Sequence, residues 1–342
     1  MELIMSINFY ELSRSTYEEY EIETEKEEEE GYDTSNFSIF NDKLSGLRKG
    51  FYIFAGESNG GKTAIMSNLL KDYGTTAKNN LFAIYYTLDD TVGEVIPRII
   101  AMDQNIPIAV AAKPKRYEKL AAITPRTPDE EFNIEKIREQ LQRRKQGIQL
   151  LKEQSHQFMM TDGTKLHTYE DIVEHAKQAQ EFVKSLDDKN NIIIGIDSIS
   201  DIRYADKDFK DVKNKYECLS EDLKKLANTD LQIPVFGTAH LRKLNHGGRP
   251  SLDDLKDSVR LQYDASVTFL VHNDVSKNSN SAKVFYNREG KEEIQPIIEV
   301  HWAKNKRSEF KGRTFYYFIP EYSKVTECTL QDSERFNNII RG

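Results

Sequence analysis

The sequence predicts an α/β fold in which a mostly parallel β-sheet is covered by helices on both faces. Short apolar stretches of strand length alternate with helical patterns along most of the chain, which is typical of parallel strands joined by crossover helices. The octapeptide Gly56–Thr63 fits the G-x-x-x-x-G-K-[ST] pattern of a phosphate-binding P-loop. The region from Ile297 to Phe318 alternates with the period expected of an antiparallel hairpin at one sheet edge. Together these observations predict the fold of a P-loop NTPase.

The expected elements follow from where apolar residues cluster. Two long helices are expected at Phe132–Phe158 and Thr168–Leu186, and a short helix at Ser6–Tyr20. A further strand is expected near Phe285. The remaining strands are the apolar stretches Phe51–Ala55, Leu81–Thr87, Asn191–Asp197, Ile233–Thr238, Ala265–His272 and Ile297–Ala303.

The P-loop has the context that its motif requires. We expect a buried strand at Phe51–Ala55 before it and a helix at Ala64–Leu70 after it. In this arrangement backbone N–H groups and the positive end of the helix face phosphate oxygens. Lys62 is expected to reach the β- and γ-phosphates of ATP, and the Thr63 hydroxyl to ligate Mg²⁺. The candidate nucleotide-binding residues of the loop are Gly56, Glu57, Ser58, Asn59, Gly60, Gly61, Lys62 and Thr63.

Further polar residues end predicted strands, and parallel strands point these ends at a common ligand crevice. Asp197 ends an apolar strand and is the expected carboxylate on the Mg²⁺ side. Asp89 and Asp90 follow another strand, where an acid can activate the attacking water or cap the next helix. His240 ends a third strand, where it is either a sensor of the γ-phosphate or a structural residue.

Charge is distributed unevenly along the 342 residues. Residues 1–35 hold twelve Asp or Glu and two Lys or Arg, whereas the whole chain has a net charge of −8. The remainder is therefore close to neutral, and the acidic balance does not exclude a nucleic-acid partner. We expect an acidic N-terminal segment (1–35), a nucleotide-binding domain (36–326) and a C-terminal tail (327–342). The acidic segment is either a disordered linker or a docking segment for a neighbouring subunit or a basic partner.

Cysteine usage and hydropathy indicate the cellular setting. Cys218 and Cys328 are far apart and lack metal-site spacing, which excludes a disulfide framework or a Cys-rich zinc site and suits a reducing cytoplasm. The N-terminus lacks the features of a signal peptide, and no apolar run is long enough to span a membrane. We therefore expect a cytoplasmic protein with no membrane partner.

Six stretches follow one another in a specific order. They are Phe37–Lys49, Tyr86–Asp89, Ile194–Ser198, Tyr216–Ala227, Arg249–Val267 and Trp302–Arg307. In this order they resemble the C-terminal motor domain of DnaB-like replicative helicases, which are RecA-fold ATPases that act as hexameric rings. The Arg249–Val267 block is the most specific match, and in the family it carries a DNA-contacting loop. The resemblance covers roughly residues 36–326.

The resemblance implies a RecA-like fold and an ATP hydrolase, with Mg²⁺ as cofactor, that acts as a DNA helicase or translocase of the 5'-3' type. Asp89 would be the catalytic base. The Trp302–Arg307 stretch would reach the nucleotide of a neighbouring subunit. The implied catalytic residues are Asp89, Lys62, Lys304, Lys306 and Arg307, and the implied Mg²⁺ ligands are Thr63 and Asp197.

The resemblance also implies partners. Single-stranded DNA would bind in the central channel of a homo-oligomeric ring, and a primase or helicase loader is a candidate partner. Contacts to the DNA backbone would tolerate any sequence and weaken with salt. The candidate DNA-binding residues are Lys256, Arg260, Lys210, Lys213 and Lys215, and each is alternatively a solvated surface charge.

The chain departs from the family pattern at several points. Asp89 stands where the family has Glu, which shortens the base by one methylene. The position of the finger arginine falls on Lys306, which lacks the bidentate fork of a guanidinium, although Arg307 follows it. His240 replaces the usual Gln. Because only the acidic segment precedes the motor, we expect no N-terminal primase-interacting domain.

Two other classes of function stay open on the residues alone. His240 and the short N-terminal segment favour a RecA-like ATPase that assembles on DNA without unwinding it, as recombinases and recombination mediators do. A scaffold or signalling ATPase would instead use the acidic segment to contact its partner. The Arg249–Val267 block favours the helicase.

Overall fold

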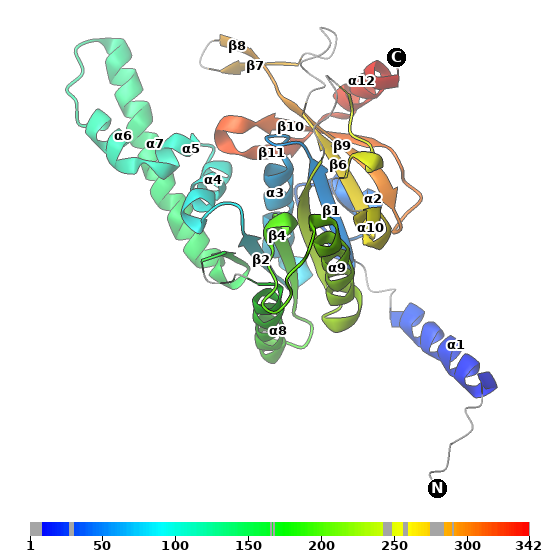
Figure 1. Cartoon of the computed structure of the whole chain (residues 1–342). Helices are drawn as coiled ribbons and strands as arrows, with labels where there is room; N and C mark the ends of the chain where they lie inside the picture. Colours follow the sequence, from blue (N-terminus) through cyan, green and yellow to red (C-terminus); the bar gives the residue numbers. More distant parts are fainter. Residues whose placement is uncertain are drawn as a thin grey trace.

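A nine-stranded sheet forms the centre of the computed structural model (Figure 1). The structure describes residues 9–26, 31–164, 166, 168–241, 248–255, 259–273, 284–288 and 291–341. The strands of the sheet are β1 (Gly50–Gly56), β2 (Leu81–Thr87), β3 (Phe158–Asp162), β4 (Asn191–Asp197), β5 (Pro234–His240), β6 (Val267–His272), β9 (Ile297–Asn305), β10 (Arg313–Ile319) and β11 (Lys324–Glu327). Their order is β11-β10-β9-β6-β1-β5-β4-β2-β3.

The sheet has a parallel part and an antiparallel part. The strands β1 to β6 pair in parallel, whereas β9, β10 and β11 add to the β6 edge as an antiparallel group. A separate hairpin pairs β7 (Phe285–Arg288) with β8 (Lys291–Ile294). The predicted α/β fold, with a mostly parallel sheet and a C-terminal antiparallel hairpin, is therefore confirmed.

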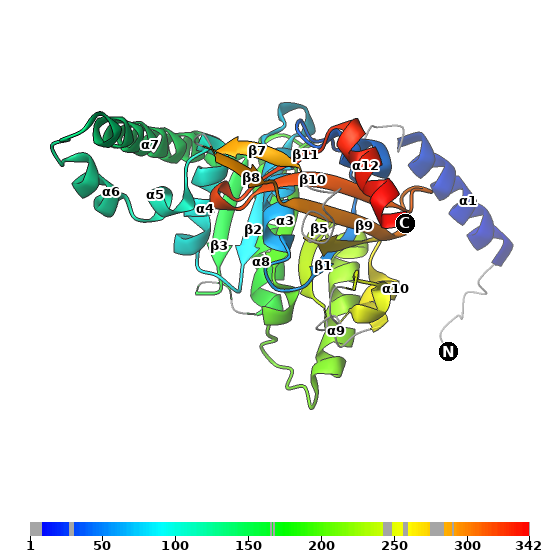
Figure 2. The same ribbon diagram turned by 90° about the horizontal axis from the view of Figure 1, so that it is seen from above.

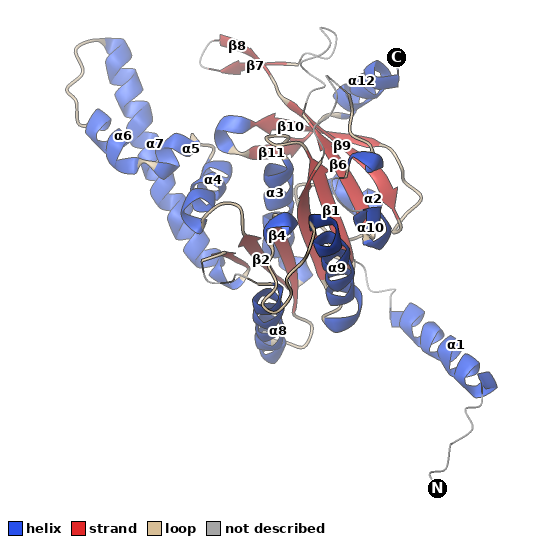
Figure 3. Ribbon diagram, viewed as in Figure 1, coloured by secondary structure: helices blue, strands red, loops and turns tan. Residues whose placement is uncertain are grey.

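Helices cover both faces of the sheet (Figure 3). Alternation along β1 shows why, because Tyr52 and Phe54 pack with α2 and α3, whereas Phe51, Ile53 and Ala55 pack with α8 and α9. A strand buried on both faces is apolar throughout, as β1 is. The bounds of the helices are α1 (Phe9–Lys26), α2 (Ser38–Leu44), α3 (Lys62–Thr75), α4 (Val92–Gln104), α5 (Ile108–Ala112), α6 (Pro114–Ala121), α7 (Pro128–Glu153), α8 (Tyr169–Leu186), α9 (Val212–Lys225), α10 (Val259–Asp264) and α12 (Leu330–Arg341).

The long helix predicted at Phe132–Phe158 is placed differently in the structure. The helix α7 begins at Pro128, where the Thr127 hydroxyl caps it by accepting from the Glu130 N–H, and ends at Glu153. Phe158 instead begins strand β3, which pairs with β2. Its run of apolar residues is as compatible with a short strand as with a helix end, and only the pairing with β2 decides between them.

Two peripheral parts extend the description of the chain. Helices α5, α6 and α7 form a helical arm between β2 and β3 that projects away from the sheet in two views (Figures 1 and 2). The segment 327–342, expected as a tail, contains α12, whose Phe336 is buried against Phe315 of β10. Among the described helices, none combines the length and apolar character needed to cross a bilayer.

Candidate nucleotide-binding and active site

The P-loop joins the end of β1 to the first turn of α3. Lys62 is buried, and its ammonium donates a hydrogen bond of 2.8 Å to the Glu57 carbonyl oxygen. Gly61 has φ +93°, and a Cβ at this position would lie 2.7 Å from Ile298 Cδ1 of β9. Only glycine therefore fits the turn that presents the start of α3 to a phosphate.

Three hydroxyl groups surround the carboxylate of Asp197 at the end of β4. Thr63 and Tyr85 donate hydrogen bonds of 2.7 and 2.8 Å to Oδ2, and Thr238 donates to Oδ1. Asp197 is buried, so these bonds replace the water that the carboxylate would otherwise bind. Asp197 and Thr63, which we expected to lie on the Mg²⁺ side, are thus in direct contact.

Asp89 and Asp90 follow β2 and have different partners. The Asp90 carboxylate accepts a hydrogen bond of 2.5 Å from Arg98. Neither acid caps α4, because Thr91 and Glu94 form a capping box at that helix. Asp89 is exposed at the cavity wall, and its backbone N–H donates to the Asp197 carbonyl oxygen at 3.2 Å. The carboxylate of Asp89 is therefore the one directed at the crevice.

Electrostatic interactions link the residues at this crevice. Burial lowers the pKa of Lys62, and this effect is opposed by the charges of Asp197, Asp89 and Glu57. Loss of hydration and repulsion by Asp201 raise the pKa of Asp89.

His240 ends β5 beside Gly56 of β1. Burial and the Lys62 charge lower the pKa of His240, so its imidazole is neutral near neutral pH and can both donate and accept a hydrogen bond.

A cavity of about 510 Å³ lies over these groups. The P-loop, Asp89, Asp197 and His240 form one side of it, and the residues after β10 form another. The donor set fits Mg²⁺-ATP: oxygen ligands from Thr63 and Asp197 suit a hard cation, and the N-terminus of α3 with Lys62 suits phosphate. The full lining is Ser58, Asn59, Gly60, Gly61, Lys62, Thr63, Ala64, Asp89, Asp90, Arg98, Ile108, Asp197, His240, Phe318, Pro320 and Ser323.

Residues 34–327 match the family model of the DnaB-like helicase C terminal domain. The chain belongs to this family. No curated protein matches it by sequence. Two solved structures resemble it, each with a TM-score of 0.67 and 20% identity. One is an isolated ATPase domain, with 95% of this chain and 100% of that chain covered. The other is a DnaB-like replicative helicase studied with its primase interactions, with 91% and 67% covered.

Within this DnaB-like domain, the residues after β9 lie far from their own P-loop. On β6, Val271 lies beside Gly56, whereas Thr268, the partner of Lys304, lies beside Ile53. Three residues of a strand span about 10 Å. The Lys304 side chain also points away from the P-loop, because its ammonium donates to the Tyr263 carbonyl oxygen at 2.8 Å.

Three basic residues follow the end of this strand and differ in how they are held. Lys304 and Lys306 both donate to the Tyr263 carbonyl oxygen near the C-terminus of α10. Arg307 donates to the Lys49 carbonyl oxygen, at the start of β1 of the same chain. Lys306 is the most exposed of the three. Burial and the neighbouring Lys306 charge lower the pKa of Lys304 to about 8.

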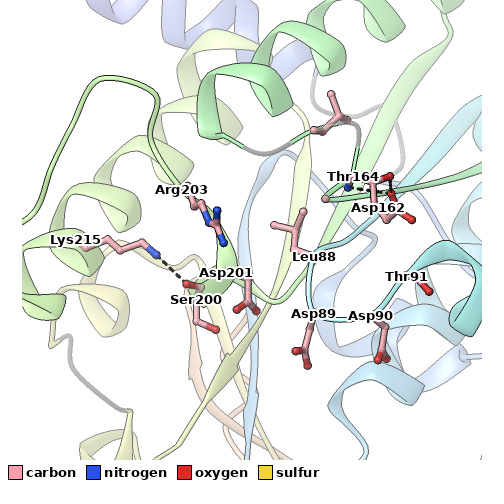
Figure 4. A pocket seen from close by; sticks show the side chains of 12 residues that line it. Leu88, Asp89, Asp90, Thr91, Asp162, Thr164, Ser200, Asp201, Arg203 and Lys215 are labelled. Atoms are coloured by element: carbon pink, nitrogen blue, oxygen red, sulfur yellow. Dashed lines mark hydrogen bonds between the residues drawn. The ribbon is translucent and has the colours of Figure 1, made fainter.

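A second cavity of about 500 Å³ lies beside the first and shares Asp89 and Asp90 with it (Figure 4). Asp201 and Lys215 line its opposite side. The Lys215 ammonium donates to the Ser200 carbonyl oxygen at 2.9 Å, and burial lowers its pKa. Lys215 therefore faces a pocket next to the nucleotide cavity.

The other candidate DNA-binding residues lie on or near α9 and α10. Lys210 and Lys213 are exposed at the start of α9, and Lys213 lies 3.9 Å from the Glu217 carboxylate. The Arg260 guanidinium pairs with Asp264 at 3.2 Å and with Glu221 at 3.3 Å. Lys256 lies outside the described residues.

Sequence reasoning missed Tyr85, Thr238 and Arg98. Strand register is the signal that finds the first two, since Thr87 lies beside Asp197 on β4 and Tyr85 shares its face of β2. Thr238 follows Gly237, the partner of Ile196. Arg98 lies two turns into α4, where a cation can return to an acid before the helix.

Proposed function

We propose that this chain is the ATP-hydrolysing motor of a DNA helicase or translocase, working as a ring with nucleotide at each subunit boundary and single-stranded DNA in the channel. The observation that supports this most is the assembly of Lys62, Thr63, Asp197 and Asp89 around one cavity in a chain of the DnaB-like family. Mg²⁺ held by Thr63 and Asp197 would neutralise charge on the β- and γ-phosphates.

The roles of the protein groups follow from their positions. Lys62 is buried at the end of the cradle and exchanges its bond to the Glu57 carbonyl for phosphate oxygens. Asp89 is placed to orient the attacking water and accept its proton, and the Arg98 pair keeps Asp90 out of that role. His240 lies between the P-loop and Leu241, so it can report the γ-phosphate to the chain that follows.

The same cavity requires a cation from another subunit, because Lys304 and Lys306 cannot approach their own P-loop. A positive charge from a neighbour would stabilise the charge that develops on the transferred phosphoryl group. Lys306 is the best candidate of the three basic residues, since it is exposed and Arg307 is held inside its own chain.

The helix α1 supports assembly into a ring. Figures 1 and 2 both draw it apart from the sheet. Tyr10, Tyr17 and Tyr20 share one face of the helix and are exposed. Exposed aromatic groups on one face are typical of a protein contact. We therefore assign α1 the role of docking on a neighbouring subunit.

The deciding experiment compares ATP turnover with and without an oligodeoxythymidine, together with strand displacement and the mass of the assembly. A ring whose turnover is stimulated by the oligonucleotide and which displaces a strand fits the helicase. A filament that binds DNA without displacement indicates a recombinase or mediator. Turnover that is indifferent to DNA indicates a scaffold ATPase and contradicts the proposal.

A further inference from the structure

A buried carboxylate of β9 lies next to the P-loop but outside the nucleotide cavity. Glu299 is 1% exposed. Its Oε2 accepts a hydrogen bond of 3.0 Å from Arg249 Nε, and its Oε1 accepts one of 2.6 Å from Arg313 Nε. An ionised carboxylate at this depth is tolerated only with such partners. Glu299 therefore holds together two arginines from different segments of the chain.

One side of Glu299 leads to the P-loop. The preceding residue, Ile298, is fully buried, and a Cβ built on Gly61 would lie 2.7 Å from its Cδ1. The start of β9 is thus in close contact with the turn that receives the phosphates. Because protein interiors are close-packed, a displacement of Gly61 has to be matched by the start of β9.

The other side of Glu299 leads to the segment 248–255. Arg249 begins this segment, and Ser251 and Asp254 form a capping box that shapes its middle. Its last residue, Leu255, forms a bridge with Leu241, which directly follows His240. The segment is therefore held at one end by Glu299 and at the other end next to His240.

We propose that Glu299 is a positioning residue that links the P-loop to segment 248–255 through Arg249, so that nucleotide and DNA change each other's affinity. The proposal rests on the proposed function only in taking DNA as the second ligand. A ligand can shift such a link only by binding its two arrangements differently, and the effect on the two affinities is reciprocal. The contacts of Ile298, Glu299 and Arg249 form a continuous physical path between the two sites.

The test compares Arg249→Gln with Arg313→Gln in the full chain. Each variant removes one of the two cations on the same buried carboxylate and leaves the other, so both lose similar support for Glu299. Both arginines are partly exposed, at 35% and 30% of the side chain, so both variants are expected to fold. The readouts are the factor by which Mg²⁺ and ATPγS change the affinity for an oligodeoxythymidine, the DNA-free ATPase rate and the melting temperature.

We expect Arg249→Gln to reduce the coupling factor by at least about tenfold, within the range of typical allosteric couplings. Its DNA-free ATPase rate is expected to stay near that of the unmodified chain. Arg313→Gln is expected to keep the coupling factor even if it melts earlier. An unchanged coupling factor in Arg249→Gln overturns the proposal. Equal losses in both variants, in step with the melting temperature, show a merely structural ion cluster and also overturn it.

A second readout separates this proposal from the proposed function. Hydrogen exchange of residues 248–255 is measured with and without Mg²⁺ and ATPγS, in the absence of DNA. Nucleotide-dependent protection that is lost in Arg249→Gln and kept in Arg313→Gln supports the link, even if the chain binds no oligodeoxythymidine. Protection that persists in Arg249→Gln, or that is absent from the unmodified chain, contradicts the link whatever the DNA result.

Discussion

The hydroxyl of Thr63 donates a hydrogen bond of 2.7 Å to the Asp197 carboxylate. The two residues come from the first turn of α3 and the end of β4, so the fold brings together a hydroxyl and a carboxylate far apart in sequence. Both are oxygen donors of the kind that Mg²⁺ prefers. The protein thus assembles its side of the Mg²⁺ site through its own hydrogen bonds.

Asp197→Asn is expected to lower ATP turnover by at least about a hundredfold, the scale of one lost electrostatic stabiliser. The amide keeps the shape of the carboxylate but loses its charge, and its NH₂ group cannot accept from the Tyr85 or Thr238 hydroxyls. Steady-state ATPase at saturating Mg²⁺ measures the effect. Thr238→Ser, which keeps the hydroxyl, is the control. Normal turnover in Asp197→Asn would remove this carboxylate from the mechanism.

Asp89→Asn is expected to lower turnover by about 10²–10⁴-fold, the usual contribution of a general base. Nucleotide binding should persist, because the P-loop is unchanged. Asp90→Asn is the matched control, since it breaks the pair with Arg98 but leaves Asp89 in place. Single-turnover hydrolysis and binding of a fluorescent ATP analogue separate the two steps. The opposite ranking of the two variants would assign the base to Asp90.

The turnover rate is expected to fall at both ends of the pH range. The raised pKa of Asp89 means that this base keeps its proton to a higher pH than an ordinary Asp, which moves the acid limb of the profile upward. The pKa of Lys304 is lowered to about 8, so its positive charge is lost above that pH. In Lys304→Arg the charge persists, and the alkaline limb should move to higher pH. A profile of kcat against pH that is identical in Lys304→Arg would exclude Lys304 as the source of that limb.

Two inactive variants are expected to restore activity when mixed. Lys62→Ala lacks the ammonium that binds phosphate, and the triple variant Lys304→Ala/Lys306→Ala/Arg307→Ala lacks the cations offered to a neighbour. Since Lys304 lies too far along the sheet to reach its own P-loop, one subunit can supply what the other lacks. The ATPase rate of the mixture is compared with that of each variant alone. Full activity of a dilute monomer would contradict a shared site.

Lys210→Ala/Arg260→Ala is expected to weaken binding of single-stranded DNA equally for all sequences, because phosphate contacts carry no base information. The log–log salt slope should fall by roughly one unit for each cation removed from the phosphates. Arg260 is paired with Asp264 and Glu221, so part of its effect is the release of those carboxylates. Lys225→Ala, at the opposite end of α9, is the control. Equal slopes in the double variant and the control would remove both residues from the DNA site.

The sequence predicted the catalytic edge of the sheet well because strands and P-loop carry short-range signals. Each strand that ends in Asp197 or His240 is a continuous apolar run, and a buried parallel strand requires one. The order of strands is not a local property. Nothing within β3 indicates that it pairs with β2, so the sequence alone places its first residue, Phe158, in a helix.

The partners of the site residues depend on the same long-range order. Tyr85 contacts Asp197 only because β2 lies beside β4, and Thr238 does so because β5 lies on the other side. The choice between Asp89 and Asp90 likewise depends on the position of Arg98, which only α4 fixes. The motifs thus identify which residues take part, and the three-dimensional arrangement decides what each of them faces.

The central place of β1 has a consequence for how the chain reaches its native state. β1 is the first strand of the sheet to be synthesised, yet both of its neighbours, β5 and β6, lie beyond residue 233. Until those strands emerge, the P-loop strand has two unpaired edges and apolar side chains on both faces. Pairings between distant segments form slowly and leave such surfaces open to aggregation. The nucleotide cradle is therefore the part of the fold that depends longest on protection during synthesis.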